Sequence, residues 1–210
     1  MTPRPKPKAP RVPPHPLASE PTDLIDYTGI LWRVHRTTGA HVLPWNALRT
    51  FGPLPSMRWD PHPGSQPGPH SEGVLYCAVD IATALAEAFQ TARLIDRRDG
   101  ASQLTAWEPT RPLRLLDLSG TWLIRNGASA ALTAGSRATC RSWAREIHTR
   151  WPHLDGVAVP STMTGRLNIV LWNAARDSMP TSPAFSRALA HPLVWSIAQA
   201  AAQRIGYRIR

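Results

Sequence analysis

The stretch GVLYCAVDIATALAEAF, residues 73–89, contains the pattern that decides the fold of this chain. It begins with an apolar run that is typical of a buried strand. Asp80 follows at a position where its side chain can cap a helix, and the periodicity predicts that helix over residues 81–96. One face of this helix is apolar and consists of Ile81, Leu85, Ala88, Phe89, Ala92 and Ile95. A strand that leads into an amphipathic helix predicts a domain that mixes both kinds of element.

Further strands and helices are predicted on both sides of this unit. Apolar runs predict strands over residues 29–36, 102–109, 111–120, 155–161 and 167–172. Helical patterns occupy residues 136–152, 183–189 and 191–206. The region 51–70 is dense in proline and glycine, which predicts an ordered surface loop. We therefore expect one mixed α+β domain over residues 23–210.

Residues 1–22 differ in composition from the rest of the chain. Proline recurs every two or three residues there, among several positive charges and few apolar side chains. Proline lacks a backbone N–H, and a segment of this composition cannot bury a core. We therefore expect a disordered, basic, proline-rich tail.

The charge of the chain is strongly positive. Its 210 residues include 24 lysines and arginines against 14 aspartates and glutamates, a formal charge of +10. This excess leaves polyanion binding open, and a basic nucleic-acid-binding protein is one hypothesis. Against it, the arginines are spread along the whole chain, and no helix-turn-helix, zinc-finger or RNP pattern is present.

Several other classes of protein are disfavoured. The two cysteines, Cys77 and Cys140, cannot form a disulfide framework, so we expect a reducing, cytoplasmic location. The eight histidines are scattered and show no spacing typical of a metal site, so no metal is expected. No apolar run reaches the length of a membrane-spanning helix. The glycine patterns of Rossmann and P-loop sites are absent as well.

Two arginines are candidates for an anion site. Arg33 interrupts the apolar strand of residues 29–36, and an arginine there needs either water or an anion. Arg58 lies beside Trp59 in the proline-rich loop, where it can clamp a phosphate. The structural alternatives are an outward-facing Arg33 and a salt bridge between Arg58 and Asp60.

Three further polar residues lie at the ends of apolar segments or within them. Tyr76 lies in the predicted strand of residues 72–80 and can form the floor of a ligand pocket or pack in the core. Glu87 lies off the apolar stripe of the following helix, where periodicity alone predicts an exposed side chain. Ser161 follows another strand and, taken alone, is typical of a turn.

The order and spacing of these residues resemble those of the RES domain family over about residues 29–210. The strings that carry the resemblance are LWRVHR, MRWDP, GVLYCAVDIATALAEAF, SWAREIHTRWPHLDGVAVPS and NIVLW, with IGYR near the C-terminus. The most specific part is GVLYCAVDIATALAE, a strand–helix unit at residues 73–87.

The resemblance implies a fold similar to that of ADP-ribosyltransferases such as the diphtheria toxin catalytic domain. It also implies cleavage of NAD at the nicotinamide–ribose bond, with NAD as the substrate and no bound cofactor. The implied acceptor is water, inorganic phosphate or a target protein. Several RES proteins are toxins of toxin–antitoxin pairs, so the implied protein partner is an Xre-type antitoxin.

The family's functional residues map onto this chain as follows. Arg33 and Arg58 fall where the family places its NAD-site arginines, and Tyr76 falls on its tyrosine. Glu87 and Ser161 fall on its glutamate and serine. The resemblance thus implies that Glu87, Arg33 and Ser161 are catalytic, and that Arg33, Arg58, Tyr76 and Ser161 bind NAD.

This sequence departs from the family pattern at two places. Trp32 stands where many members have a tyrosine, and the loop between Arg58 and Tyr76 is long and proline-rich. Both departures affect the shape of the pocket and the fit of an antitoxin more than the chemistry. A catalytically inactive RES-like binding module is a further alternative, and the complete set of five residues argues against it.

Overall fold

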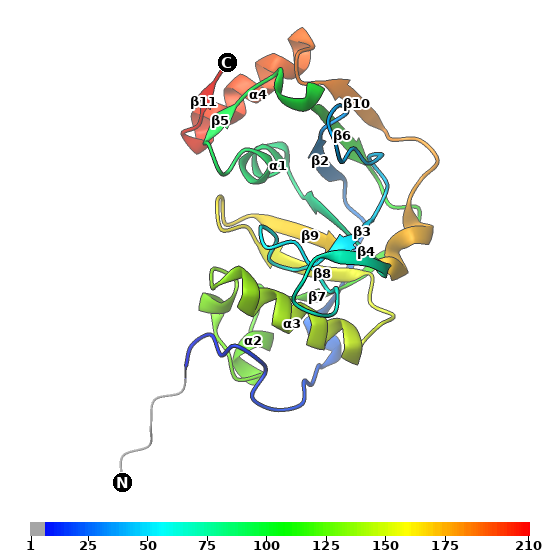
Figure 1. Ribbon diagram of the computed structural model, residues 1–210, viewed down its shortest axis with the longest axis vertical. Coiled ribbons are helices and arrows are strands. Elements are labelled where there is room, and N and C mark those ends of the chain that lie inside the picture. Colours follow the sequence, from blue (N-terminus) through cyan, green and yellow to red (C-terminus); the bar gives the residue numbers. More distant parts are fainter. Residues whose placement is uncertain (1–6) are drawn as a thin grey trace.

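A long strand, β4 (Gly68–Ala78), organises the sheet of this protein. It pairs along one edge with β9 (Leu167–Leu171) in antiparallel register. On its other edge it meets β2 (Leu31–His35) at the single residue pair Trp32–Ala78. The sheet therefore separates into two parts that diverge beyond this pair, and it curls around the interior (Figure 1).

The computed structural model describes residues 7–210. The remaining strands are β1 (Leu24–Tyr27), β3 (Arg49–Gly52), β5 (Leu94–Ile95), β6 (Gln103–Trp107), β7 (Leu113–Asp117), β8 (Gly156–Pro160), β10 (Phe185–Ala188) and β11 (Arg208–Ile209). The α-helices are α1 (Ile81–Ala88), α2 (Trp122–Arg125), α3 (Arg137–Arg150) and α4 (Pro192–Ile205). Four short 3-10 helices lie at Pro21–Asp23, Asp99–Ala101, Ala130–Leu132 and Asn173–Ser178.

The main sheet has nine strands in the order β1-β7-β8-β9-β4-β2-β6-β10, with β3 added beside β4. Its strands are antiparallel except for β7 and β8, which are parallel and are joined through α2 and α3. The short strands β5 and β11 form a separate parallel pair. This arrangement confirms the predicted mixed α+β fold.

The helices divide the interior into separate hydrophobic clusters. One cluster packs α2 and α3 against β7, β8 and β9, and it includes the fully buried rings of Trp122 and Trp143. A second packs α1 and α4 against each other and against β6. A third, built around Leu31 and Trp107, fills the other face of the sheet. In Figure 1, α3 lies below β9 and α1 lies above it, so the end of α1 and the start of α3 flank the same strands.

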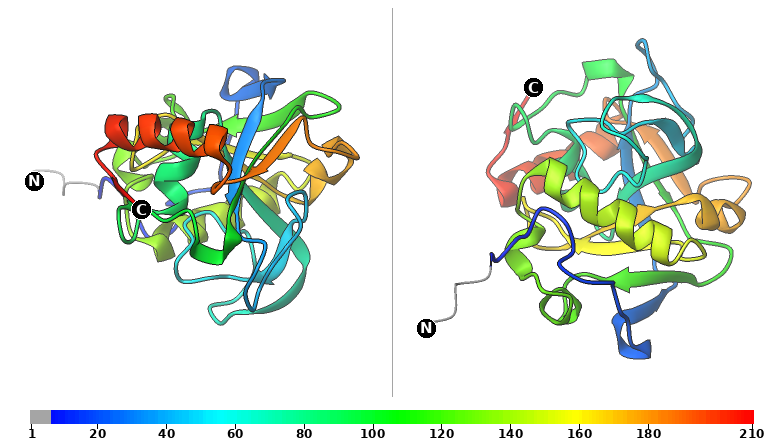
Figure 2. Two further views of the ribbon diagram at one scale, coloured as in Figure 1. Left: turned by 90° about the horizontal axis from the view of Figure 1, so that it is seen from above. Right: turned by 60° about the horizontal axis from the view of Figure 1, so that its bottom comes forward.

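The N-terminal segment differs from the predicted disordered tail. Residues 1–6 lie outside the described part of the chain, but residues 7–20 run in an irregular course along α2 and α3 (Figure 2). Leu17 is buried, and the indole N–H groups of Trp122 and Trp143 donate to carbonyls of this segment at 2.8 and 2.9 Å. Proline keeps the segment out of helices and sheets as expected, but its carbonyls satisfy buried indole donors that have no other partner.

Two predicted helices are wrong in extent or type. The helix predicted over residues 81–96 ends at Ala88, and the chain then turns so that β5 can pair with β11. The segment 183–189 is not a helix but contains β10, which pairs with β6. In both cases a distant strand supplies hydrogen bonds that outweigh the local helical preference.

No helix within residues 7–210 has the length and apolar content needed to cross a membrane. Cys77 and Cys140 are both free and buried.

The close approach of β8 and β9 requires glycine at position 156. Its φ of 154° is one that side chains rarely adopt, and a Cβ there would lie 1.9 Å from the Val170 carbonyl oxygen. We predict that Gly156→Ala lowers the free energy of unfolding by about 3 kcal/mol or more, measured by urea denaturation. The control is Gly165→Ala, which also has a positive φ but meets no atom within 4 Å. Equal losses in the two variants would contradict a steric clash.

Candidate functional site

A small pocket, partly open to solvent, lies between the C-terminal end of α1 and the start of α3. Its floor comes from β4, β8 and β9, and the loop before β4 forms one wall. The residues that line it are Ser56, Met57, Arg58, Trp59, Tyr76, Glu87, Gln90, Thr133, Arg137, Val159, Pro160, Thr162, Asn168 and Val170. Three of the five residues predicted from the sequence, Arg58, Tyr76 and Glu87, are therefore brought together here.

Glu87 is a pocket residue that other side chains hold in place. It is the second-last residue of α1, and it is half-buried rather than exposed as periodicity alone predicts. Its Oε1 accepts hydrogen bonds from Ser161 Oγ at 2.6 Å and from Asn168 Nδ2 at 2.8 Å. Its Oε2 accepts one bond from Gln90 at 3.1 Å. These three hydrogen bonds fix the orientation of the carboxylate at the edge of the pocket.

Ser161 acts on the pocket through Glu87. The serine is buried and is absent from the lining of the pocket. Its Oγ donates to Glu87 and accepts backbone N–H groups from Met163 at 3.1 Å and Thr164 at 3.3 Å. The turn between β8 and β9 thus orients the hydroxyl, and the hydroxyl orients the carboxylate. Ser161 is a positioning residue in this arrangement.

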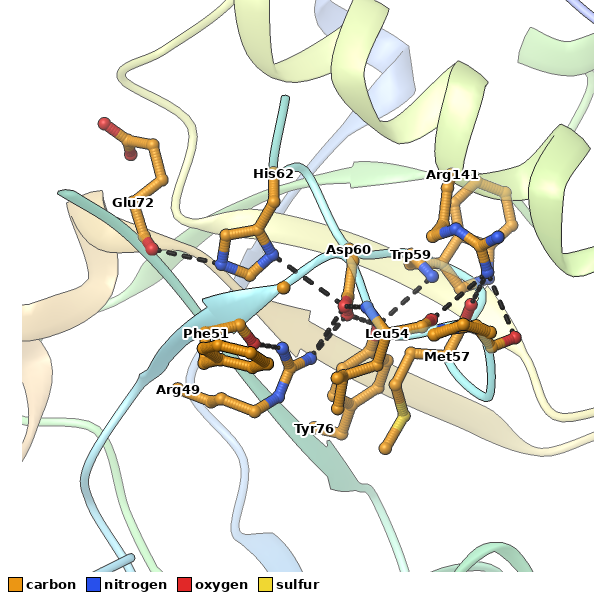
Figure 3. A network of polar contacts seen from close by, with 12 residues as sticks. Arg49, Phe51, Leu54, Met57, Trp59, Asp60, His62, Glu72, Tyr76 and Arg141 are labelled. Atoms are coloured by element: carbon orange, nitrogen blue, oxygen red, sulfur yellow. Dashed lines mark hydrogen bonds and ion pairs between the residues drawn. The ribbon is translucent and has the colours of Figure 1, made fainter. Parts of the chain in front are cut away.

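Tyr76 is held by the buried carboxylate of Asp60 (Figure 3). From the sequence, the alternative partner considered for Asp60 was Arg58. The Tyr76 hydroxyl donates to Asp60 Oδ1 at 2.7 Å and accepts the Trp59 N–H at 3.1 Å. Asp60 is completely buried, and its two oxygens accept bonds from Arg49 Nη2 at 2.7 and 2.8 Å. The Leu54 N–H donates to Oδ2 at 2.8 Å.

The pKa values of this network follow from its contacts. Burial by itself would raise the pKa of Asp60, but the imidazole of His62, the Arg49 guanidinium and the Tyr76 hydroxyl together lower it to about 2. Burial and the charge of Asp60 raise the pKa of Tyr76 well above its ordinary value. The tyrosine therefore remains a hydrogen-bond donor, and Asp60 remains a carboxylate at neutral pH.

Arg58 has no acidic partner among the described residues, because Asp60 forms its ion pair with Arg49 instead. The expected alternative, an Arg58–Asp60 salt bridge, is absent from the described residues. Arg58 Nη1 donates to the carbonyl of Gly135, just before α3. On the same side, Arg141 of α3 donates to three carbonyls of the loop, those of Leu54, Pro55 and Met57, at 3.2, 3.2 and 2.8 Å (Figure 3). The loop that carries Arg58 is thus tied to α3.

Arg33 lies apart from this pocket. It is half-buried on β2, and its Nη1 donates to the Trp45 carbonyl at 2.6 Å. Alternation along β2 places it on the same face as Leu31, whereas Trp32 packs with the cluster of α1 and α4. Burial lowers the pKa of Arg33 to about 10, so the side chain stays charged at neutral pH. It is not turned out to solvent, and its role toward NAD stays a prediction.

Three contributors to the site were missed by sequence reasoning. Asn168 is an amide within an apolar strand, which is the signal that could have identified it. Arg137 begins α3, and nothing in its local pattern separates it from the other arginines of that helix. The Arg49–Asp60 pair joins β3 to the proline-rich loop and has no signature in the sequence.

In residues 7–210, no group of three histidine, cysteine, aspartate or glutamate side chains is arranged to hold a metal ion.

Comparison with known proteins agrees with this fold. No curated protein matches the chain. Among solved structures, a chain of the M. tuberculosis MbcT–MbcA toxin–antitoxin complex superposes with a TM-score of 0.56 at 16% sequence identity. The match covers 87% of this chain and 91% of that one. At this identity the likeness concerns the fold, a mixed α+β domain of the same architecture.

The sequence also matches a protein family. The RES domain matches residues 30–208, which is nearly the whole domain and excludes only the N-terminal segment and the last two residues. The chain belongs to the RES domain family, which confirms the resemblance found in the sequence.

The depressed pKa of Asp60 predicts a specific pH dependence of stability. A native pKa of about 2 lies below the ordinary aspartate value, so Asp60 contributes stability that is complete above about pH 4 and is lost as the pH falls toward 2. The linked contribution is on the order of 2–3 kcal/mol. Urea denaturation from pH 7 to pH 2 should show this loss in the wild type. The variant Asp60→Asn should be less stable at pH 7 and should lack this part of the pH dependence. A parallel decline of the free energy of unfolding with falling pH in the wild type and in Asp60→Asn would contradict the assignment of this pH dependence to Asp60.

Proposed function

We propose that this protein cleaves NAD at the bond between nicotinamide and ribose. The observation that carries the proposal is the carboxylate of Glu87, which Ser161 and Asn168 fix at the edge of a pocket that also contains Tyr76 and two arginines. RES-domain toxins generally act on NAD, which supports the same substrate.

The reaction needs a group that stabilises positive charge. When the C–N bond breaks, its electron pair leaves with nicotinamide, which departs neutral, and the ribose becomes an oxocarbenium-like cation. A carboxylate held beside this cation stabilises it electrostatically, and it does so best when it is oriented in advance. Ser161 and Asn168 supply that orientation for Glu87. The acceptor then attacks the cation and releases a proton.

The other residues bind and orient the substrate in this proposal. The ring of Tyr76, held by Asp60, packs beside nicotinamide and limits its movement. Arg58 contacts the diphosphate through its guanidinium, which lacks a carboxylate partner among the described residues. Arg33 lies outside this pocket, and its role toward NAD stays a prediction.

We further propose that the protein is the toxin of a toxin–antitoxin pair, with an Xre-type antitoxin as its partner. Membership of the RES family and the likeness to a chain of the MbcT–MbcA complex support this role. An enzyme that consumes NAD without restraint harms its own cell, and this explains the need for an inhibitory partner.

The reaction and its acceptor are tested together. Purified protein is incubated with NAD alone, with NAD and inorganic phosphate, and with NAD and added cell protein, and the products are separated by chromatography. Release of nicotinamide in any of the three mixtures supports the proposal. ADP-ribose identifies water as the acceptor, ADP-ribose-1″-phosphate identifies phosphate, and transfer only to added cell protein identifies a protein acceptor. An intact NAD pool in all three mixtures would favour the inactive binding module.

Glu87→Gln should lose about 10²- to 10³-fold in the rate of nicotinamide release, because glutamine keeps the shape of the side chain and removes its charge. The hydrogen bonds from Ser161 and Asn168 can still be accepted by the amide oxygen, so the thermal stability should be retained. The matched control is Glu146→Gln, which removes a charge from an exposed position on α3 outside the pocket. If Glu87→Gln retains more than about a third of the wild-type rate, Glu87 is not the catalytic carboxylate.

Expression of the wild type in bacterial cells should deplete NAD and arrest growth, whereas equal amounts of Glu87→Gln should do neither. The measurements are cellular NAD, viable counts and the amount of soluble protein. Normal NAD in cells with abundant soluble wild-type protein would contradict the proposed toxicity.

A further inference from the structure

The pocket contains two arginines that no carboxylate neutralises. Arg58 and Arg137 both line it, and neither forms an ion pair with an acidic side chain among residues 7–210. The one carboxylate in the lining, Glu87, accepts its hydrogen bonds from Ser161, Asn168 and Gln90. Several other arginines of the described chain are paired with acidic residues, as in Arg36–Asp99, Arg111–Asp155, Arg125–Asp23 and Arg210–Asp96. The pocket thus contains two arginines that form no ion pair with an acidic residue of the described chain.

The two guanidinium groups come from adjoining parts of the wall. Arg58 Nη1 bonds the carbonyl of Gly135, and Arg137 follows Gly135 after the single residue Ser136. Arg141, one turn further along α3, binds the loop carbonyls on either side of Ser56 and so holds the loop of Arg58 against this helix. The fold therefore fixes Arg58 next to the start of α3.

The position of Arg137 is unfavourable for the helix itself. The first turn of α3 contains no acidic residue and begins with this arginine, although the helix dipole favours negative charge there. A residue that opposes a local preference without a stabilising partner is expected at a functional site. Both arginines line one pocket, and a diphosphate offers several oxygens that can accept hydrogen bonds from two planar guanidinium groups.

We infer that Arg137 is the partner of Arg58 in a subsite for the diphosphate of a dinucleotide. The inference rests on the proposed function and assigns to Arg137 a binding role that sequence reasoning gave to Arg33. Glu87 holds the ribose end of the substrate, and the two arginines hold the diphosphate at the side of α3. The pocket consequently distinguishes dinucleotides from nicotinamide nucleosides, which lack the diphosphate.

The first measurement is substrate discrimination. The rate of nicotinamide release from NAD and from nicotinamide riboside is compared for the wild type, Arg137→Ala, Arg58→Ala and the control Arg145→Ala. Arg145 lies two turns along the same helix, outside the pocket. Arg137→Ala should lose about tenfold or more in kcat/KM for NAD, mainly through KM, as expected for a charge-assisted contact. Its kcat/KM for the riboside should stay within about twofold.

The second measurement is binding of ADP, which carries the diphosphate without the reacting bond, by titration calorimetry. ADP should bind about tenfold more weakly to Arg137→Ala and should bind normally to Arg145→Ala. Equal weakening of ADP binding by Arg137→Ala and Arg145→Ala would show that ADP responds only to the general positive charge of the surface. That result would overturn the subsite. Failure of the wild type to bind ADP would overturn it as well.

The two assays separate this inference from the proposed function. If the wild type cleaves NAD and Arg137→Ala cleaves it equally well, the subsite is wrong and the proposed function stands. If the wild type leaves NAD intact but binds ADP through Arg137, the reaction is wrong and the subsite stands. Arg137→Lys, which keeps the charge without the planar fork, should restore NAD use only in part.

Discussion

The carboxylate of Asp60 is completely buried and receives hydrogen bonds from three separate parts of the chain (Figure 3). Arg49 approaches from β3, Tyr76 from β4 and the Leu54 N–H from the loop between them. A buried charge is tolerated only when its lone pairs are satisfied, and removal of one partner leaves the others unpaired. The network therefore fixes the proline-rich loop, the added strand and the central strand relative to one another, and the pocket wall depends on all three.

The same network determines which groups remain available to a ligand. Because Arg49 neutralises Asp60, Arg58 has no acidic partner among the described residues and lines the pocket with a free charge. Because the Tyr76 hydroxyl is bound at both its donor and acceptor positions, the ring cannot turn away from the floor of the pocket. The Arg49–Asp60 pair thus leaves Arg58 without an acidic partner, and Asp60 fixes the orientation of Tyr76 in the neighbouring pocket. Such preorganisation is what binding and catalysis generally require.

On the opposite wall of the pocket, Glu87 is likewise held by hydrogen bonds from distant parts of the chain. Its helix ends one residue later, and the turn between β8 and β9 delivers Ser161 while β9 delivers Asn168. Both side chains donate to Oε1 of the carboxylate, and Oε2 accepts a bond from Gln90. Glycine at position 156 allows β8 and β9 to approach closely at the other end of this pair of strands. The same two strands therefore contribute to core packing and to the pocket.

The strand–helix unit around Asp80, the mixed fold class and the RES family could be predicted from the sequence, because hydrophobic periodicity, capping residues and ordered motifs are local properties. Arg58, Tyr76 and Glu87 were predicted to share a site, and these three residues line one pocket. Only the tertiary structure decided where the first helix ends, that residues 185–188 form a strand, and that much of the N-terminal segment lies against α2 and α3. It likewise decided that Asp60 pairs with Arg49, and that Asn168 and Arg137 reach the pocket while Arg33 does not line it. These outcomes depend on contacts between residues far apart in the chain, and the energy of such contacts outweighs local preference without leaving a pattern in the neighbouring residues.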